Sequence, residues 1–207
     1  MTCSLAGSLT LRLRYSFIRM PLATIALGAN IPSPAGPPET TLVAAAMHLA
    51  TLGHIVARSS LYSTTPVGFH DQPRFVNAVI ALETKLSPRE LLEALLLIEL
   101  DFGRNREASP ANGPRTLDLD LLFYGDLVLT ESGLEVPHPR LAERAFVLVP
   151  LHEIAPNLRD PRSLKTVAEL LAALENHTAQ DAVVKIVHGG WSARVLAPSL
   201  RDSEINL

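Results

Sequence analysis

The sequence predicts an α+β fold: a ferredoxin-like βαββαβ antiparallel sheet with helices on one face, an added hairpin and extra helices. Three observations support this. Apolar stretches and helical patterns follow one another in the order strand, helix, strand, strand, helix, strand. Ser87-Pro-Arg-Glu90 is a capping box with proline at the first helical position. Residues 117–124 alternate apolar and acidic side chains before they become fully apolar, which is typical of a half-buried strand entering a core.

The first half of the domain supplies five of these elements. We expect strands at residues 23–27, 55–62 and 75–86 and helices at 40–52 and 88–102. Gly28 ends the first strand, and Gly53 and Gly103 end the two helices. The segment between the second and third strands carries Pro66, Gly68 and Pro73, so it is a loop long enough to carry function.

The second half begins with a polar loop at 104–114 and the acidic strand. Gly125-Asp126 reads as a two-residue hairpin turn into a strand at 127–129. An extended segment and a short helical turn follow, then an apolar strand at 146–151. A second capping box, Thr166-Val-Ala-Glu169, opens a helix that we expect to reach about residue 174. A last strand is expected at 183–187.

Composition limits the function. The chain has 207 residues, of which 47% are hydrophobic and 19% charged, as in one globular domain. A net charge of −3 gives no reason to expect nucleic acid binding. The single cysteine, Cys3, cannot form an internal disulfide, and no apolar run approaches a membrane span, so we expect a cytoplasmic protein without membrane contact. We also expect a monomer.

The ends differ from the domain at residues 21–175. Residues 1–20 contain Arg12, Arg14 and Arg19 and no acid, which is typical of a weak transit peptide. The alternative that we favour is an over-long assigned start before Met20, so this extension should be non-essential. Residues 176–207 form a C-terminal extension of unknown role.

The candidate chemistry lies on the acidic strand. Asp118 and Asp120 project from one face, roughly 6–7 Å apart along the strand, while Leu117, Leu119 and Leu121 bury on the other face. Two adjacent carboxylates repel each other unless a cation lies between them. Mg²⁺ suits this position because it binds one or two carboxylates together with substrate phosphates. Arg115 precedes the strand, where it could meet an anion. The alternative is a solvated acidic face with one edge arginine.

The stretch Gly113-Pro-Arg-Thr-Leu-Asp-Leu-Asp120 resembles the signature of 6-hydroxymethyl-7,8-dihydropterin pyrophosphokinase, an enzyme family of folate synthesis. Further segments resemble the family in the same order, so that the resemblance covers about residues 22–175. These segments are Leu27-Gly-Ala-Asn30, Ser60-Leu-Tyr-Ser-Thr-Thr-Pro-Val-Gly68, Asp71-Gln-Pro73, Phe75-Val-Asn77, Val136-Pro-His138 and Glu143-Arg-Ala-Phe146.

The resemblance implies transfer of pyrophosphate from ATP to the pterin hydroxymethyl group, with release of AMP. Such a transfer depends on positioning and charge neutralisation more than on covalent chemistry by the protein. It implies two Mg²⁺ ions on Asp118 and Asp120, which bridge the phosphates of ATP. A metal-bound hydroxyl is easier to deprotonate, so an Asp is a candidate proton acceptor and no separate strong base is required.

The resemblance also implies roles for further residues. Arg104 and Arg106 match arginines of a mobile catalytic loop, although two exposed loop cations are the alternative. Arg115, His138 and Arg144 match ligands on the phosphate side; a structural hydrogen bond is the alternative for His138. On the nucleotide side are Glu99, with a solvated helix residue as the alternative, and Leu121. Phe75 and Phe146 match an aromatic sandwich around the pterin, although composition alone would put both in the core. The pterin-edge contacts implied are Thr64, Asn77 and the backbone around Val67.

Several positions depart from the family pattern. Phe75 replaces a frequent tyrosine, Thr65 a frequent proline, and Pro139 an occasional tyrosine. The loop at 107–112 lacks the basic and tryptophan residues of some members, so we expect its closure over ATP to use fewer contacts.

Two other functions are compatible with parts of the sequence. A nucleotide-sugar glycosyltransferase also binds a metal through Asp-x-Asp, but it would have a larger domain of alternating parallel strands and helices. A non-catalytic ferredoxin-like ligand-binding module would leave the Asp pair and its arginines without a purpose. Formation of AMP from ATP and Mg²⁺ only when the pterin is present would exclude both.

Overall fold

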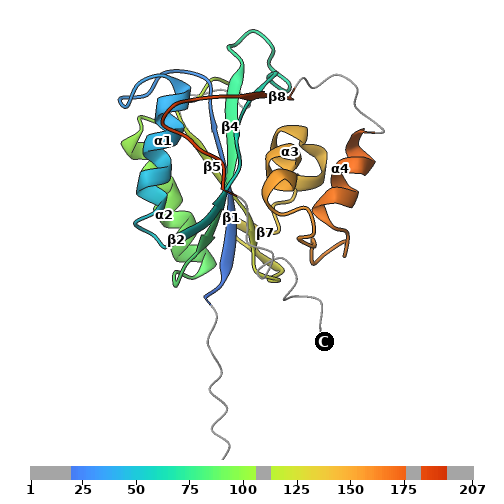
Figure 1. Ribbon diagram of the computed structural model, residues 1–207. Coiled ribbons are helices and arrows are strands. Elements are labelled where there is room, and N and C mark those ends of the chain that lie inside the picture. Colours follow the sequence, from blue (N-terminus) through green and yellow to red (C-terminus); the bar gives the residue numbers. More distant parts are fainter. Residues whose placement is uncertain (1–19, 106–112, 176–182, 195–207) are drawn as a thin grey trace, which may run out of the picture.

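The computed structural model describes residues 20–105, 113–175 and 183–194. Its centre is a six-stranded sheet with strand order β5-β1-β4-β3-β8, in which β2 also pairs with β4 (Figure 1). Every pairing in this sheet is antiparallel. The expectation of an α+β domain with an antiparallel sheet is therefore confirmed. The strands are β1 Leu22–Ala29, β2 His54–Arg58, β3 Leu61–Thr64, β4 Phe75–Glu83, β5 Asp118–Tyr124 and β8 Val183–Ile186.

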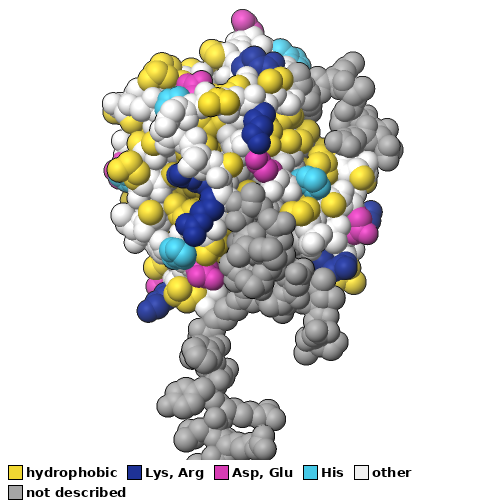
Figure 2. All heavy atoms as spheres, viewed as in Figure 1, with side chains coloured by type: hydrophobic (Ala, Val, Ile, Leu, Met, Phe, Trp, Pro, Cys, Tyr) yellow, Lys and Arg dark blue, Asp and Glu magenta, His cyan; other side chains and the backbone are white. Residues whose placement is uncertain are grey.

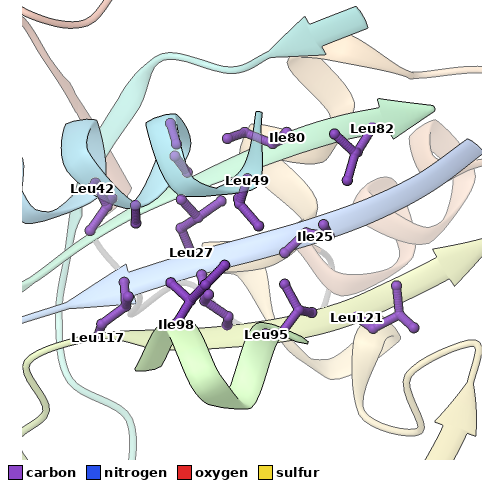
Figure 3. Close-up of a cluster of buried hydrophobic side chains, with 14 of the residues drawn as sticks. Ile25, Leu27, Leu42, Leu49, Ile80, Leu82, Leu95, Ile98, Leu117 and Leu121 are labelled. Carbon is purple, nitrogen blue, oxygen red and sulfur yellow. The ribbon is translucent and has the colours of Figure 1, made fainter. Parts of the chain in front are cut away.

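The helices cover both faces of the sheet rather than one, which corrects the sequence-based expectation. On one face α1 (Pro38–Leu49) and α2 (Pro88–Asp101) pack against the strands, and Figure 3 shows Leu42, Leu49, Leu95 and Ile98 pointing at the sheet. On the other face α3 (Ala145–Ile154) and α4 (Val167–Glu175) build a second apolar cluster. The central strands are thus buried on both sides, which explains their nearly continuous apolar sequences.

The segment predicted as a strand at 146–151 is helix α3, so that prediction was wrong. A short, fully apolar run has no polar residues to reveal its period. In the structure its buried residues, Val147, Leu148, Leu151 and Ile154, follow helical spacing. They pack against the second face of the sheet, beside the 3₁₀ turn η1 (Leu141–Glu143) that was expected around 140–144.

The predicted strand at 55–62 is interrupted. It forms β2 and β3, separated at Ser59 and Ser60, which are both buried. Ser59 continues the contact with β4, because its amide donates to the Val79 carbonyl oxygen (2.9 Å) and its hydroxyl oxygen accepts from the Val79 amide (3.0 Å). The backbone groups at the interruption also have partners, because the Ser60 amide donates to Glu153 of α3 (2.6 Å) and the Ser59 carbonyl oxygen accepts from Trp191 Nε1 (2.7 Å).

The added hairpin exists but differs from the prediction. β6 (Leu129–Glu131) pairs with β7 (Leu134–Val136) in a separate two-stranded sheet, and not with the acidic strand across Gly125-Asp126. Gly133, with φ of +71°, makes the turn between β6 and β7. Leu127 and Val128, expected to be in the strand, are exposed connecting residues.

Both predicted capping boxes are present. The Ser87 hydroxyl accepts from the Glu90 amide (3.3 Å), and the Glu90 carboxylate accepts from the Ser87 amide (2.8 Å). Thr166 and Glu169 repeat the arrangement at the start of α4 (3.1 and 2.7 Å). These reciprocal bonds fix the first turns of α2 and α4.

The C-terminal residues that the structure describes belong to the same sheet and core. β8, expected at 183–187, pairs with β3, and Trp191 is 8% exposed within the first apolar cluster. Residues 1–19, 176–182 and 195–207 lie outside the described residues. No helix in the described ranges is long and apolar enough to cross a membrane. On the face shown in Figure 2, the described charged side chains lie in small separate groups of both signs.

Candidate active site

The two carboxylates of the acidic strand lie where the alternation predicted. Asp118 and Asp120 pair with Gly28 and Ala26 of β1. Their side chains are 19% and 30% exposed, whereas Leu119, between them, is 1% exposed on the opposite face. The register shift in the pairing of β1 and β5 lies between Thr24 and Ile25, opposite Leu121 to Phe123, so it comes after both aspartates and leaves their alternation intact.

Asp118 is held by arginines from two loops. Arg115 Nη1 lies 2.6 Å from Asp118 Oδ2, and Arg104 Nη2 lies 3.6 Å from Asp118 Oδ1. The side chains of Arg104 and Arg115 are 11% and 18% exposed, so the alternative of a freely exposed cation does not hold for Arg104. Arg106 lies outside the described residues.

Asp120 has its own pair of basic neighbours. Arg144 Nη1 lies 3.1 Å from Asp120 Oδ2, and His138 Nε2 lies 4.0 Å from the same oxygen. The His138 amide donates to the Leu122 carbonyl oxygen (2.8 Å), just after a cis bond between Val136 and Pro137. Burial lowers the pKa of His138, and the nearby arginines add to this effect against the opposing influence of Asp120.

The two carboxylates can bind a hard divalent cation only if the substrate supplies the remaining oxygen ligands. Among the described residues, no group of three or more His, Cys, Asp or Glu side chains could hold a metal ion. Two carboxylates on one rigid strand are what Mg²⁺ uses when phosphates and water supply the remaining oxygen ligands. The arginines at both carboxylates can meet the same phosphates. The residues therefore suit a metal that arrives with a polyphosphate.

A pocket of about 670 Å³, including its open mouth, lies beside the Asp pair. Strand residues form one side of this pocket, and η1 and the start of α3 form the other. Its lining brings together residues far apart in the sequence: Gly28, Thr64, Thr65, Val67, Phe75, Asn77, Arg115, Asp118, Arg140, Glu143, Arg144 and Phe146.

Two half-buried phenylalanines line this pocket. Phe75 begins β4 and Phe146 lies in the first turn of α3. Neither is fully buried, although Phe146 also packs against the second apolar cluster. A role for the pair around the pterin stays a prediction. The guanidinium of Arg115 lies 5.3 Å from the centre of the Phe75 ring, and that of Arg144 lies 5.6 Å from the centre of the Phe146 ring.

The polar edge of the pocket is preorganised. Asn77 Nδ2 donates to Thr64 Oγ1 (2.7 Å), and both side chains are buried. A Cβ atom on Gly28 would lie 2.9 Å from Asn77 Oδ1, so glycine at this position leaves the amide where it is. The pocket thus presents a fixed amide and hydroxyl together with two aromatic side chains, a combination that suits a flat ligand with hydrogen-bonding edges.

The model of one protein family, described as 7,8-dihydro-6-hydroxymethylpterin-pyrophosphokinase (HPPK), matches residues 24–156. This chain belongs to the HPPK family. Its relatives include two proteins named 2-amino-4-hydroxy-6-hydroxymethyldihydropteridine pyrophosphokinase. The Pseudomonas aeruginosa protein is 47% identical over 149 residues, which cover 72% of this chain and 89% of the relative. The Synechocystis protein is 45% identical over 155 residues, with coverage of 74% and 76%.

The fold is also similar to solved structures. Wild-type HPPK-DHPS of Plasmodium falciparum matches with a TM-score of 0.61 at 14% sequence identity, over 84% of this chain. This chain spans about half of that longer protein, since 50% of it is covered. At this identity the likeness shows the fold alone.

Two residues that the HPPK resemblance assigned to the nucleotide side are buried. Glu99 is 1% exposed at the end of α2, and its Oε1 accepts from the Leu119 amide (2.8 Å). The alternative of a solvated helix residue is therefore wrong, and Glu99 supports the acidic strand between its two aspartates. Leu121 is 5% exposed in the core below α2, so its side chain faces away from Asp118 and Asp120. A nucleotide contact for either residue stays a prediction.

Some lining residues were not predicted. Gly28, Thr65, Arg140 and Glu143 complete the pocket, although Gly28, Thr65 and Glu143 lie inside segments that resembled the HPPK family. Asn30 holds the loop before β5 through two hydrogen bonds to Arg115. Its side-chain Oδ1 accepts from the Arg115 backbone amide (2.8 Å), and its backbone amide donates to the Arg115 carbonyl oxygen (3.0 Å). The signal for these residues was the family segment, since a lone glycine or asparagine carries no chemical pattern.

Proposed function

We propose that this chain transfers pyrophosphate from ATP to the hydroxymethyl group of 6-hydroxymethyl-7,8-dihydropterin, giving AMP and the pterin diphosphate in folate biosynthesis. This is the reaction of the HPPK family, to which the chain belongs. The single observation that supports it best is that two sites meet. The pocket lined by the two phenylalanines is also lined by Asp118 and by Arg115 and Arg144, the arginines that bind the Asp118 and Asp120 carboxylates.

The pterin side of the proposal rests on Phe75, Phe146, Asn77 and Thr64, with the backbone around Val67. The flat ring stacks between the two phenylalanines, and its edge exchanges hydrogen bonds with the fixed Asn77–Thr64 pair. Because this pair is buried and already oriented, little conformational freedom is lost on binding. The hydroxymethyl group then points towards Asp118, which lines the same pocket.

The phosphate side rests on Asp118 and Asp120, to which we assign two Mg²⁺ ions that accompany ATP. When bound, these ions neutralise phosphate charge as the bond between the α- and β-phosphates breaks. Arg115 and Arg144 keep the carboxylates oriented through one nitrogen and retain further N–H donors for phosphate oxygens. A carboxylate of the pair accepts the proton of the substrate hydroxyl, so no separate strong base is needed.

The remaining assignments are further parts of this proposal. Arg104 and Arg106 stabilise charge at the transferred group, His138 binds phosphate, and Glu99 and Leu121 lie on the nucleotide side. The antiparallel order β5-β1-β4-β3, with β2 and β3 counted as one interrupted strand, supports the ferredoxin-like topology as our assignment of the fold.

Two alternative functions are less well supported. A nucleotide-sugar transferase would have a sheet of mostly parallel strands, whereas every pairing described in the central sheet is antiparallel. A binding module without catalysis gives no purpose to the carboxylates and basic residues at the mouth of the pocket.

The test is formation of AMP from ATP and Mg²⁺, measured with and without the pterin. The proposal predicts pterin-dependent AMP and a pterin diphosphate in equal amounts. AMP without the pterin, or no AMP in the presence of all three reactants, would contradict the proposed function.

A further inference from the structure

A carboxylate outside the proposed site collects an unusual number of donors. Glu153, near the end of α3, accepts from the Ser60 amide (2.6 Å), the Ser60 hydroxyl (2.8 Å), the Tyr62 hydroxyl (3.0 Å) and Lys185 Nζ (2.7 Å). Its side chain is 18% exposed, and Ser60 and Tyr62 are 7% and 8% exposed. The acceptor capacity of both carboxylate oxygens is used, two bonds on each.

These bonds join the elements that carry the two walls of the pocket. Glu153 lies seven residues after Phe146, so both project from the same face of α3, roughly 10 Å apart along its axis. On the strand side, Tyr62 pairs with Asn77 and Thr64 pairs with Phe75. The Glu153 contacts therefore attach the helix that presents one aromatic wall to β3, which carries Thr64. β3 in turn pairs with β4, the strand that presents Phe75 and Asn77.

Apolar packing alone would hold α3 near the sheet without fixing its position along it. The residues of α3 that face the sheet are Val147, Leu148, Leu151 and Ile154, and burial of such side chains has no directional preference. Hydrogen bonds to one carboxylate do have a preferred geometry, and here they come from two residues of the interrupted strand. The position of Phe146 relative to Phe75 then depends on Glu153.

We propose that Glu153 is a positioning residue that sets the separation and register of Phe146 and Phe75, and through them the affinity for the pterin. This inference rests on the proposed function, because it names how that same pocket is held. Glu153 itself does not line the pocket, so it acts through α3 and β3.

Lys185 contributes differently from the strand donors. It comes from β8, beyond the residues that match the family model, and its side chain is 58% exposed. Removing it leaves the bonds from Ser60 and Tyr62 in place. Lys185→Met is therefore a variant in which the carboxylate keeps its link to β3 and loses only its link to β8.

The experiment measures two dissociation constants, one for the pterin and one for a non-hydrolysable ATP analogue in the presence of Mg²⁺. The melting temperature of each variant is measured as well. Glu153→Gln keeps the shape but turns an amide NH₂ towards groups that donate. We expect its affinity for the pterin to fall about tenfold, and that for the ATP analogue to change less than about twofold. Lys185→Met should retain most of the affinity for the pterin.

A control separates positioning from general loss of stability. Tyr124→Phe removes a partly buried hydrogen bond to the Leu86 carbonyl oxygen (2.6 Å) at the other end of β1, where Tyr124 pairs with Ala23. It should lower the melting temperature and leave the affinity for the pterin unchanged. If Glu153→Gln does not fold, Tyr62→Phe removes one donor more mildly and is judged by the same criterion.

A double-mutant cycle tests whether Glu153 affects pterin binding through Phe146. If Glu153 acts by positioning Phe146, Glu153→Gln should weaken pterin binding much less in a Phe146→Ala background than in the native chain. Fully additive losses, or an affinity for the pterin within twofold of the native chain in Glu153→Gln, would overturn the inference. A native chain that binds the pterin but forms no AMP would instead contradict the proposed function and leave the cycle measurable.

Discussion

The guanidinium of Arg115 joins the Asp118 carboxylate to the Phe75 ring. One of its nitrogens lies 2.6 Å from Asp118 Oδ2, and its central carbon lies 5.3 Å from the centre of the ring. Arg144 repeats the arrangement between Asp120 (3.1 Å) and Phe146 (5.6 Å). Each phenylalanine of the pocket is therefore linked to one carboxylate through one arginine, so we expect a change at the carboxylates to affect the proposed pterin side as well.

The first prediction concerns the carboxylates. Asp118→Asn or Asp120→Asn should lower turnover by about two orders of magnitude or more, because preorganised charge at the phosphates is lost. Each aspartate has basic neighbours, so losing one should cost folding stability about 1 kcal/mol or less, as expected for partly exposed ion pairs. Steady-state kinetics and chemical unfolding measure the two effects. Asp126→Asn, in an exposed turn, is the control, and near-native turnover in either site variant would contradict the assignment.

The second prediction concerns the aromatic walls. Phe146→Ala should weaken pterin binding by about 1–3 kcal/mol, the scale of burying one large side chain, with little effect on ATP binding. Phe69→Ala removes an aromatic ring that is 46% exposed and does not line the pocket, so it should leave pterin binding unchanged. Calorimetric titration of each ligand measures this. Equal losses for both ligands in Phe146→Ala would indicate a residue that acts only through the core.

The third prediction compares two glycines. In Gly28→Ala the new Cβ would lie 2.9 Å from Asn77 Oδ1, so the end of this side chain must shift, whereas the other nearest neighbours of the new Cβ are side-chain atoms at 4.0 Å. The shifted amide then no longer holds the pterin edge, so affinity for the pterin should fall about tenfold, while the melting temperature falls less than in Gly53→Ala. In Gly53→Ala the new Cβ would collide with the Glu83 carbonyl oxygen, which cannot move freely. This variant should lose stability, and the opposite pattern in the two variants would be inconsistent with the geometry.

Particular residues show what the sequence could predict. The alternation around Leu119 placed both aspartates on one face, and two capping boxes located two helix starts, because these signals are local. Helix α3 was misassigned, since six apolar residues in a row have no detectable period. Glu153 could not be found at all. Its partners Ser60, Tyr62 and Lys185 lie on other strands, and only the folded chain brings them to one carboxylate.

The fourth prediction concerns acid. Burial alone would raise the pKa of Glu153, but hydrogen bonds from Lys185, Ser60 and Tyr62 outweigh burial and hold it below its ordinary value of 4.5. A carboxyl group whose pKa is lower in the folded state than in the unfolded state stabilises the fold at pH values above the unfolded pKa. This stabilisation is lost as the pH falls towards the folded pKa. Below about pH 4.5 the native chain should therefore lose stability more steeply than Glu153→Gln. Urea unfolding at several pH values measures the two slopes, and parallel curves would contradict the prediction.

The last prediction concerns the two ends. A chain that begins at Met20 keeps every element described here, so we expect native stability and activity. A chain that ends at Glu175 loses β8, Lys185 and Trp191, whose indole N–H donates to the Ser59 carbonyl oxygen (2.7 Å). Because a buried aromatic side chain is worth about 3–5 kcal/mol, this chain should be strongly destabilised, and Trp191→Ala should reproduce much of the loss. Thermal unfolding of the three variants beside the full chain tests this. Native stability in the chain that ends at Glu175 would show that β8 and Trp191 contribute nothing to the stability of the domain. A loss of stability in this chain and in Trp191→Ala would show that they are part of the domain.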